Sequence, residues 1–289
     1  MDEVLHVPVL VEETICNLVD EKTEVFVDAT MGLGGHSYEI LRRFDRIKVV
    51  GFDVDEDELE IAKERLKEFG NRVFILRENY RNMANALQKI GIQMVDAILF
   101  DLGLSSYQLR SKRGFSFQED EFLDMRMDIR EEVTAYDVVN RYPLTKLVEI
   151  LRNNSDENEA LRIAKAIVNR RKTKYIETTR ELAEIVEKAK RKKGRVHPAT
   201  LTFQAIRMEV NREVENLKMG LVNACRILKK RGKIGVISFH SVEDRIVKEF
   251  FKNESSLKPV TKKPITPERE EILKNPRSRS AKLRVAEKV

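Results

Sequence analysis

The chain has 289 residues, 42% hydrophobic and 35% charged, which is enough for one large or two modest domains with a substantial core. The net charge is +6, no apolar run reaches the length of a membrane span, and the two cysteines, Cys16 and Cys225, exclude a disulfide framework. We therefore expect a soluble, cytoplasmic protein.

The first hundred residues predict alternating strands and helices, as in a doubly wound sheet. Strands are expected at 24–28, 48–53, 72–76 and 95–101, with helices after the first two. Right-handed crossovers between such strands make the sheet parallel.

The pattern changes after residue 103, where no strand is convincing up to residue 203. Helical spacing is found near 134–141, 144–153, 156–172 and 179–192. The α/β pattern then returns with a helix ending at Gly232, a strand at 233–239, a helix at 242–251 and an edge strand at 281–289. This order predicts an α/β domain interrupted by a helical insertion.

Basic residues are concentrated in two regions. Residues 162–195 contain thirteen Lys and Arg against four Asp and Glu, and residues 258–289 contain ten against four. Two basic regions indicate a polyanionic partner such as a nucleic acid. A chain rich in Lys and Glu is also typical of heat-adapted proteins, so charge alone leaves both interpretations open.

Three glycines, Gly32, Gly34 and Gly35, lie in the turn DATMGLGGHS (28–37) between the first strand and its helix. Glycine is used where a turn needs positive φ or close backbone approach. Such a turn offers backbone N–H groups beside a helix N-terminus, which favours an anion or a ligand carrying one.

Acidic residues at the ends of strands narrow the choice of ligand. Asp53 ends the second strand, where Rossmann-type folds place a ribose-binding acid, so the ligand is expected to be a dinucleotide or S-adenosylmethionine (SAM). Ser37 replaces the third glycine of the dinucleotide motif. Asp28 would face the ammonium of SAM but repel a pyrophosphate, and Asp101 ends the fourth strand at the same edge. Taken singly, Asp28 or Asp101 is better explained as a cap or turn residue.

The two cysteines narrow the choice of the group that accepts the methyl. Methylation of a pyrimidine ring carbon needs an accessible cysteine, and both cysteines lie in apolar helical segments. An exocyclic amine, a hydroxyl or a protein group remains, with Asp101 as the expected contact on the acceptor side. Tyr80 either stacks on an adenine or covers the sheet edge. The histidines show no metal-ligand spacing, so no metal is expected.

Six motifs occur in an order that resembles a known family: GLGGHS, DLGLSSYQL, RGFSF with LDMRMD, HPATLTFQAIR, ISFHSVEDRIVK and NPRSRSAKLR. The family is the bacterial H-type 16S ribosomal RNA (cytosine-N4)-methyltransferases, which methylate the N4 amine of a cytidine in the decoding region. The resemblance spans nearly the whole chain. Between RGFSF and LDMRMD this chain has QEDEF where the family often has Gly-Pro, which leaves the path of loop 115–128 open.

The resemblance implies a class I SAM-dependent methyltransferase fold, Rossmann-like with a mostly parallel sheet, and an inserted all-helical domain. Residues 1–112 and 204–289 would bind SAM, and residues 113–203 would recognise RNA. The implied partner is 16S rRNA within the 30S subunit. The implied cofactor residues are Gly34, Gly35 and His36 at the methionine end, Asp53 at the ribose, Tyr80 at the adenine, and Asp101 and Gln108 near the reacting end.

Two other functions stay open from the residues alone. One is a nicotinamide-dependent oxidoreductase, against which Ser37 and Asp28 argue. The other is a non-catalytic RNA-binding assembly factor that has kept the fold, although it would have no reason to retain Asp53 and Asp101 at the strand ends.

Overall fold

The computed structural model describes residues 8–191 and 196–289, so the last four residues of the first basic region lie outside it. The chain divides into two compact units, residues 1–103 with 215–289 and residues 104–214. The insertion limits expected from the sequence, 113–203, lie inside the second unit. None of the described helices is long and apolar enough to cross a membrane.

The first unit is built on a seven-stranded sheet with the order β3-β2-β1-β4-β5-β7-β6. Its strands are β1 (Val25–Asp28), β2 (Lys48–Asp53), β3 (Val73–Arg77), β4 (Val95–Asp101), β5 (Leu228–Ser238), β6 (Leu257–Pro259) and β7 (Lys282–Lys288). Strands β1 to β5 pair in parallel, whereas β7 runs antiparallel to both β5 and β6. The mostly parallel α/β sheet predicted from the sequence is confirmed.

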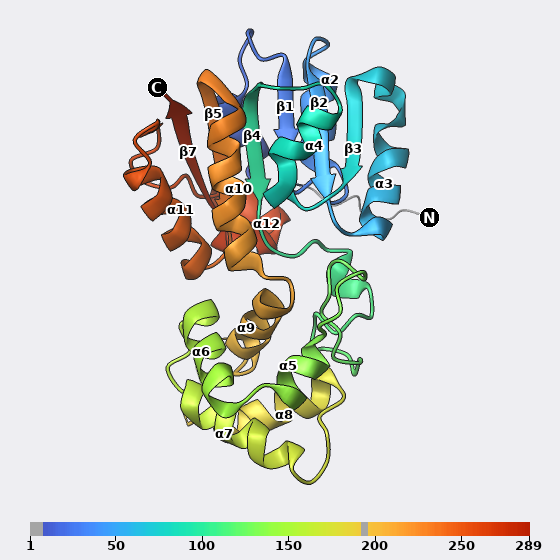
Figure 1. Cartoon of the computed structure of the whole chain (residues 1–289), viewed down its shortest axis with the longest axis vertical. Helices are drawn as coiled ribbons and strands as arrows, with labels where there is room; N and C mark the ends of the chain where they lie inside the picture. Colours follow the sequence, from blue (N-terminus) through green and yellow to red (C-terminus); the bar gives the residue numbers. More distant parts are fainter. Residues whose placement is uncertain (1–7, 192–195) are drawn as a thin grey trace. The chain divides into compact units, whose positions relative to one another are not determined.

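Helices cover both faces of this sheet. The remaining elements of the first unit are α1 (Val11–Leu18), α2 (Gly35–Arg43), α3 (Glu56–Leu66), η1 (Lys67–Arg72), η2 (Tyr80–Asn82), α4 (Met83–Lys89), α10 (Glu213–Ile227), α11 (Ser241–Asn253), α12 (Arg269–Lys274) and η4 (Pro276–Ser280). Helices α1, α2 and α3 share one core cluster, and α4, α10 and α11 share the other; Figure 1 shows α4 and α10 across the same face. Adjacent strand residues alternate between the clusters, so Phe26 packs on one side and Val27 on the other.

The end of α10 was predicted wrongly. Apolar spacing extended the helix to Gly232, but α10 ends at Ile227 and Leu228 already belongs to β5. Leu228 pairs with Val95, and the register then shifts, so that Ala97 pairs with Lys233. A residue whose spacing fits a helix face is thus buried in a bulged strand, because pairing with β4 overrides the local pattern.

The C-terminal basic region was also predicted wrongly as a tail with an edge strand. β7 lies between β5 and β6, so β6 forms that edge of the sheet. Arg284 and Lys282 form ion pairs with Asp244 at 2.7 and 3.2 Å. Lys288 Nζ donates to the carbonyl groups of Cys225 and Leu228. Three of the ten cations of this region therefore hold the fold together.

The second unit is helical in its regular elements. They are η3 (Gln108–Arg110), α5 (Ala135–Arg141), α6 (Leu144–Ser155), α7 (Ala160–Arg171), α8 (Thr179–Ala189) and α9 (Thr200–Val210). One apolar cluster joins all five α-helices. The buried Asn140 fixes the connection between α7 and α8, because its side chain exchanges two hydrogen bonds with the backbone of Ile176, at 2.8 and 2.9 Å.

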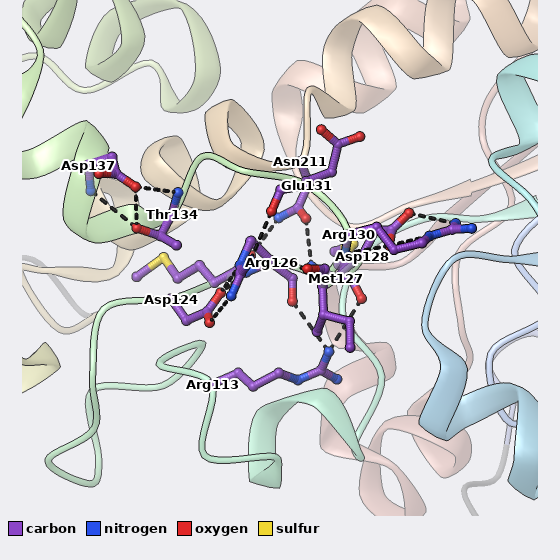
Figure 2. Close-up of polar contacts among 12 residues, drawn as sticks. Arg113, Asp124, Arg126, Met127, Asp128, Arg130, Glu131, Thr134, Asp137 and Asn211 are labelled. Carbon is purple, nitrogen blue, oxygen red and sulfur yellow. Dashed lines mark hydrogen bonds and ion pairs between the residues drawn. The ribbon is translucent and has the colours of Figure 1, made fainter.

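The loop before α5 is tied down by side chains that bind its backbone (Figure 2). Asn211 accepts from Met127 N and donates to Met125 O, while the Arg113 guanidinium donates to the carbonyl of Met127. Arg126 forms a double contact with Asp124 at 2.7 and 2.8 Å. Residues 115–128, whose path the resemblance left open, are therefore held by the Asp124–Arg126 pair within the loop and by Arg113 and Asn211 outside it.

Candidate functional site at the carboxyl ends of the strands

The turn after β1 is docked on its neighbours by its own backbone. Met31 N donates to Phe52 O, Gly32 N to Asp53 Oδ2 and Gly34 N to Met31 O, each at 2.8 Å. Gly32 and Gly34 have φ of +48° and +75°, the region that favours glycine. The N–H groups of these two glycines are used inside the protein and are therefore not offered to an anion.

The two glycines at the start of α2 also have packing reasons. A Cβ atom on Gly34 would lie 3.1 Å from Leu66 Cδ1, and one on Gly35 would lie 3.2 Å from the ring of Pro8. Both contacts are tighter than nine in ten real Cβ contacts, so a larger residue would require Leu66 or Pro8 to shift by a few tenths of an ångström. Close packing explains Gly34 and Gly35 before any ligand is considered, and their contact with a cofactor remains a prediction.

Asp53 connects β2 to the glycine turn. Its Oδ2 accepts from Gly32 N, and its Oδ1 accepts from Val54 N at 2.8 Å and Asp55 N at 3.0 Å. Burial raises the pKa of Asp53, although the backbone donors oppose the shift. Asp55 takes the N-cap position of α3. Asp53 stays partly exposed, and a carboxylate has about four acceptor sites, so a ribose hydroxyl can still bind.

Asp28 is a buried acid with one unsatisfied oxygen. It is 1% exposed, and Oδ2 accepts from Ser37 Oγ at 2.7 Å. Oδ1 is buried without a hydrogen-bond partner among the described residues. Burial raises the pKa of Asp28 to about 6, against the opposing effect of Ser37. Ser37, which the sequence singled out only as a missing glycine, thus orients this carboxyl group.

Replacing Asp28 by asparagine is expected to stabilise the ligand-free protein. The folded-state pKa of about 6 lies above the ordinary 3.8, so the Asp28 carboxyl reduces stability as the pH rises from about 4 to about 6. At pH 7 the reduction is on the order of 2–3 kcal/mol. Urea unfolding at pH 4, 5, 6 and 7 should show that Asp28→Asn removes this part of the pH dependence. An unchanged pH profile would contradict the burial of a charged carboxylate here.

Asp101 lies beside a buried histidine. His36 Nδ1 is 3.5 Å from Asp101 Oδ2, and the backbone N of Asp101 donates to Thr30 Oγ1 at 2.6 Å. Asp101 Oδ1 is buried without a hydrogen-bond partner among the described residues. Burial, followed by the charges of Asp28 and Glu243, raises the pKa of Asp101 well above its ordinary value.

Glu243, which sequence reasoning did not single out, faces this cluster from the start of α11. His240 Nδ1 accepts from Glu243 N at 3.4 Å, and Glu243 Oε2 accepts from the backbone N of Phe239, the residue before the cap, at 2.9 Å. The spacing His240-x-x-Glu243 in the HSVE sequence was the available signal. It identifies His240 as the N-cap of α11.

The two remaining predicted site residues lie in different surroundings. The Tyr80 ring contacts the Phe100 ring at 5.4 Å between centroids, and a Cβ on Gly220 of α10 would lie 2.6 Å from it. Tyr80 therefore packs partly into the core. Gln108 belongs to the second unit. Its side-chain Oε1 accepts from the backbone N of Ser105, and its own backbone N donates to Ser105 Oγ.

One premise about the cysteines was wrong. Cys225 is buried, and burial raises its pKa to about 11, as expected for a core thiol. Cys16, however, is exposed, because the buried face of α1 consists of Thr14, Ile15 and Leu18. Burial therefore excludes only Cys225 as a nucleophile.

The chemistry of this edge matches a cationic nucleoside ligand. Asp28 Oδ1 and Asp101 Oδ1 are buried acceptors that lack donors within the described residues, so this edge suits ligand groups that donate hydrogen bonds, such as the ammonium of SAM at Asp28. A pyrophosphate would instead be repelled. The sheet order and the two buried carboxylate oxygens without donors at the ends of β1 and β4 together define the class of protein: a class I SAM-dependent methyltransferase.

Comparison with known proteins gives the family. The model of the MraW methylase family matches residues 3–289, and the chain belongs to this family. The ribosomal RNA small subunit methyltransferase H of Sulfurihydrogenibium sp. (strain YO3AOP1) is 51% identical over 272 residues, covering 92% of this chain and 93% of that protein. The same-named protein of Persephonella marina is 47% identical over 290 residues, covering 98% and 99%.

Solved structures add a weaker likeness. A putative rRNA-methylase from Clostridium thermocellum is 14% identical with a TM-score of 0.47, covering 96% of this chain and 95% of that chain. A likeness at this level carries no functional argument.

Proposed function

We propose that this chain transfers a methyl group from SAM to the exocyclic N4 amine of a cytidine in the decoding region of 16S rRNA. The observation that carries the proposal is the pair of buried, unsatisfied carboxylate oxygens of Asp28 and Asp101 beside the glycine turn. The names of the full-length relatives support ribosomal RNA as the substrate. The choice of the N4 amine follows from the motif resemblance.

The residues are assigned roles at the two ends of the pocket. The proposed cofactor residues are Gly34, Gly35 and His36 at the methionine end, Asp53 at the ribose, Tyr80 at the adenine, and Asp101 with Gln108 near the reacting end. SAM supplies a sulfonium with a transferable methyl group. Asp101 Oδ1 accepts a hydrogen bond from the amine, which aligns the nitrogen lone pair and offsets the positive charge that develops on it.

The outer face of α7 supports an RNA partner. Arg162 and Lys165 of α7 and its C-cap residue Lys172 are exposed and follow one another along the helix, a span of about 15 Å. α7 contains no acidic residue. Within the described part of the chain, no ion pair involves these three cations.

Other cations of the same basic region are already used by the fold. Arg171 donates to the carbonyls of Val139 and Tyr142 at the end of α5, and Lys190 forms a buried ion pair with Glu157 at 2.8 Å. Arg171 and Lys190 therefore have structural roles, which supports assigning phosphate binding to the exposed cations instead. We assign the face formed by Arg162, Lys165 and Lys172 to the RNA backbone.

Changing Arg162, Lys165 and Lys172 together to alanine is expected to weaken RNA binding and to reduce the slope of log affinity against log salt by about 2, at about 0.7 per phosphate on a single strand. Binding is measured at several salt concentrations with 16S rRNA fragments. The control variant changes Lys63 of α3 and Lys67 at the start of η1, which already pair with Glu60 and Glu64. Equal slopes in both variants would remove α7 from the interface.

The decisive experiment for the function uses labelled SAM with 30S particles and, separately, with naked 16S rRNA. Transfer to a cytidine N4 mapped to the decoding region is the expected result, with the assembled 30S subunit as the better substrate. Label on a ring carbon, on a ribose or on protein would overturn the proposal. We place this activity in the cytoplasm, where ribosomal subunits assemble.

A further inference from the structure

Among the described residues, the His36 imidazole lies against Asp101, and its two ring nitrogens face two different acceptors. Nε2 lies 3.0 Å from the carbonyl oxygen of Val9, and Nδ1 lies 3.5 Å from Asp101 Oδ2. The His36 side chain is only 5% exposed, so water cannot freely replace either contact. A carbonyl oxygen can only accept, so Nε2 needs a hydrogen.

Because Nε2 carries a hydrogen, the contact between Nδ1 and Asp101 Oδ2 needs a second one. With its hydrogen on Nε2, a neutral His36 would turn the lone pair of Nδ1 toward Asp101. An ionised Asp101 would then place two lone pairs against each other in a buried site. One proton between Nδ1 and Oδ2 removes the conflict, whether it belongs to the imidazole or to the carboxyl group.

We propose that His36 is a positioning residue for methyl transfer: it holds one proton in common with Asp101, on the Oδ2 side, and thereby keeps Oδ1 an acceptor for the amino group of the base. The inference rests on the proposed function for its role in transfer, although the shared proton itself does not depend on the substrate.

The surroundings explain why such a device is needed. The charged groups that face Asp101 from the described elements are His36 of α2, Asp28 of β1 and Glu243 of α11. Burial and the two carboxylates favour a protonated Asp101. Without His36, that proton is free to sit on Oδ1, where it would point at the amine hydrogens. His36 decides which oxygen carries it.

The protonation state is tested directly by ¹⁵N NMR of the full-length, labelled protein. His36 signals are assigned by their loss in His36→Gln, and the spectra are recorded from pH 6 to 8.5. The expected result is a hydrogen on Nε2 throughout, with Nδ1 either protonated or hydrogen-bonded. A bare Nε2, with the hydrogen on Nδ1 alone, would overturn the shared proton.

The role in transfer is tested by the pH dependence of kcat. In His36→Gln the amide can still donate to Val9 O but cannot hold the shared proton. We expect kcat about ten- to a hundredfold lower at pH 7, the range for losing one hydrogen bond to a charged group. It should rise tenfold per pH unit as Asp101 ionises, whereas the unmodified protein should show a flat profile.

A merely structural role for His36 would lower kcat equally at every pH, and that result would overturn the proposal. Asp101→Asn provides the reference, since it should be slow without the rising limb. If the unmodified protein methylates no RNA, the proposed function fails, while the NMR result still decides the shared proton.

Discussion

Replacing Asp101 by asparagine is expected to lower kcat about a hundredfold while changing the dissociation constant of SAM less than fivefold. Removing one preorganised partner of a developing charge costs on the order of 10²–10³ in rate. Asparagine has a similar shape but presents one oxygen instead of two, next to the Nδ1 atom of His36. Single-turnover methyl transfer and calorimetry of SAM binding separate the two effects.

Asp28→Asn is the matched control for this experiment, because Asp28 is also a buried acid with an unsatisfied Oδ1. Asp28 is assigned to the ammonium of SAM, so its loss should weaken binding more than it slows transfer from the saturated complex. If Asp101→Asn mainly weakened SAM binding and Asp28→Asn mainly slowed transfer, Asp101 would be assigned to the ammonium and Asp28 to the acceptor amine. Equal effects on binding and rate would mean that neither acid contacts the acceptor amine selectively.

Replacing Asp53 by alanine is expected to raise the dissociation constant of SAM about a hundredfold, since hydrogen bonds from ribose hydroxyls to a charged acceptor are lost. The structure predicts an added loss of stability, because alanine leaves the N–H groups of Gly32, Val54 and Asp55 without their acceptor.

Asp53→Asn distinguishes the contributions of Asp53 to binding and stability. Asparagine keeps one oxygen for the backbone and removes the charge, so binding should weaken about tenfold with a smaller loss of stability. Calorimetry measures the affinity, and thermal unfolding without ligand measures the stability. Unchanged affinity in both variants would refute the ribose assignment.

The strand ends show how far sequence reasoning reaches. Alternating apolar runs and a glycine turn located β1, β2 and β4 within a residue, and parallel strands necessarily bring Asp28, Asp53 and Asp101 to one edge. The pattern works here because both faces of the sheet are covered, so each strand must be almost wholly apolar until it ends.

The residues that sequence reasoning misjudged are those whose environment is supplied by distant segments. Leu228 fits a helix stripe but pairs with Val95, and Cys16 lies in an apolar segment but on its outer face. β7 has the composition of an edge strand yet is inserted between β5 and β6. Local propensity has no information about such partners.

The sequence by itself determined the α/β class, the glycine turn and the acids at the strand ends, because these follow from local periodicity and from the geometry of parallel strands. Only the tertiary structure decided which oxygens are satisfied. Ser37 binds one oxygen of Asp28, His36 faces one of Asp101, and the other oxygen of each acid is buried without a partner in the described chain. Burial sets the cost of an unpaired polar atom, and burial is created by side chains that are far apart in sequence.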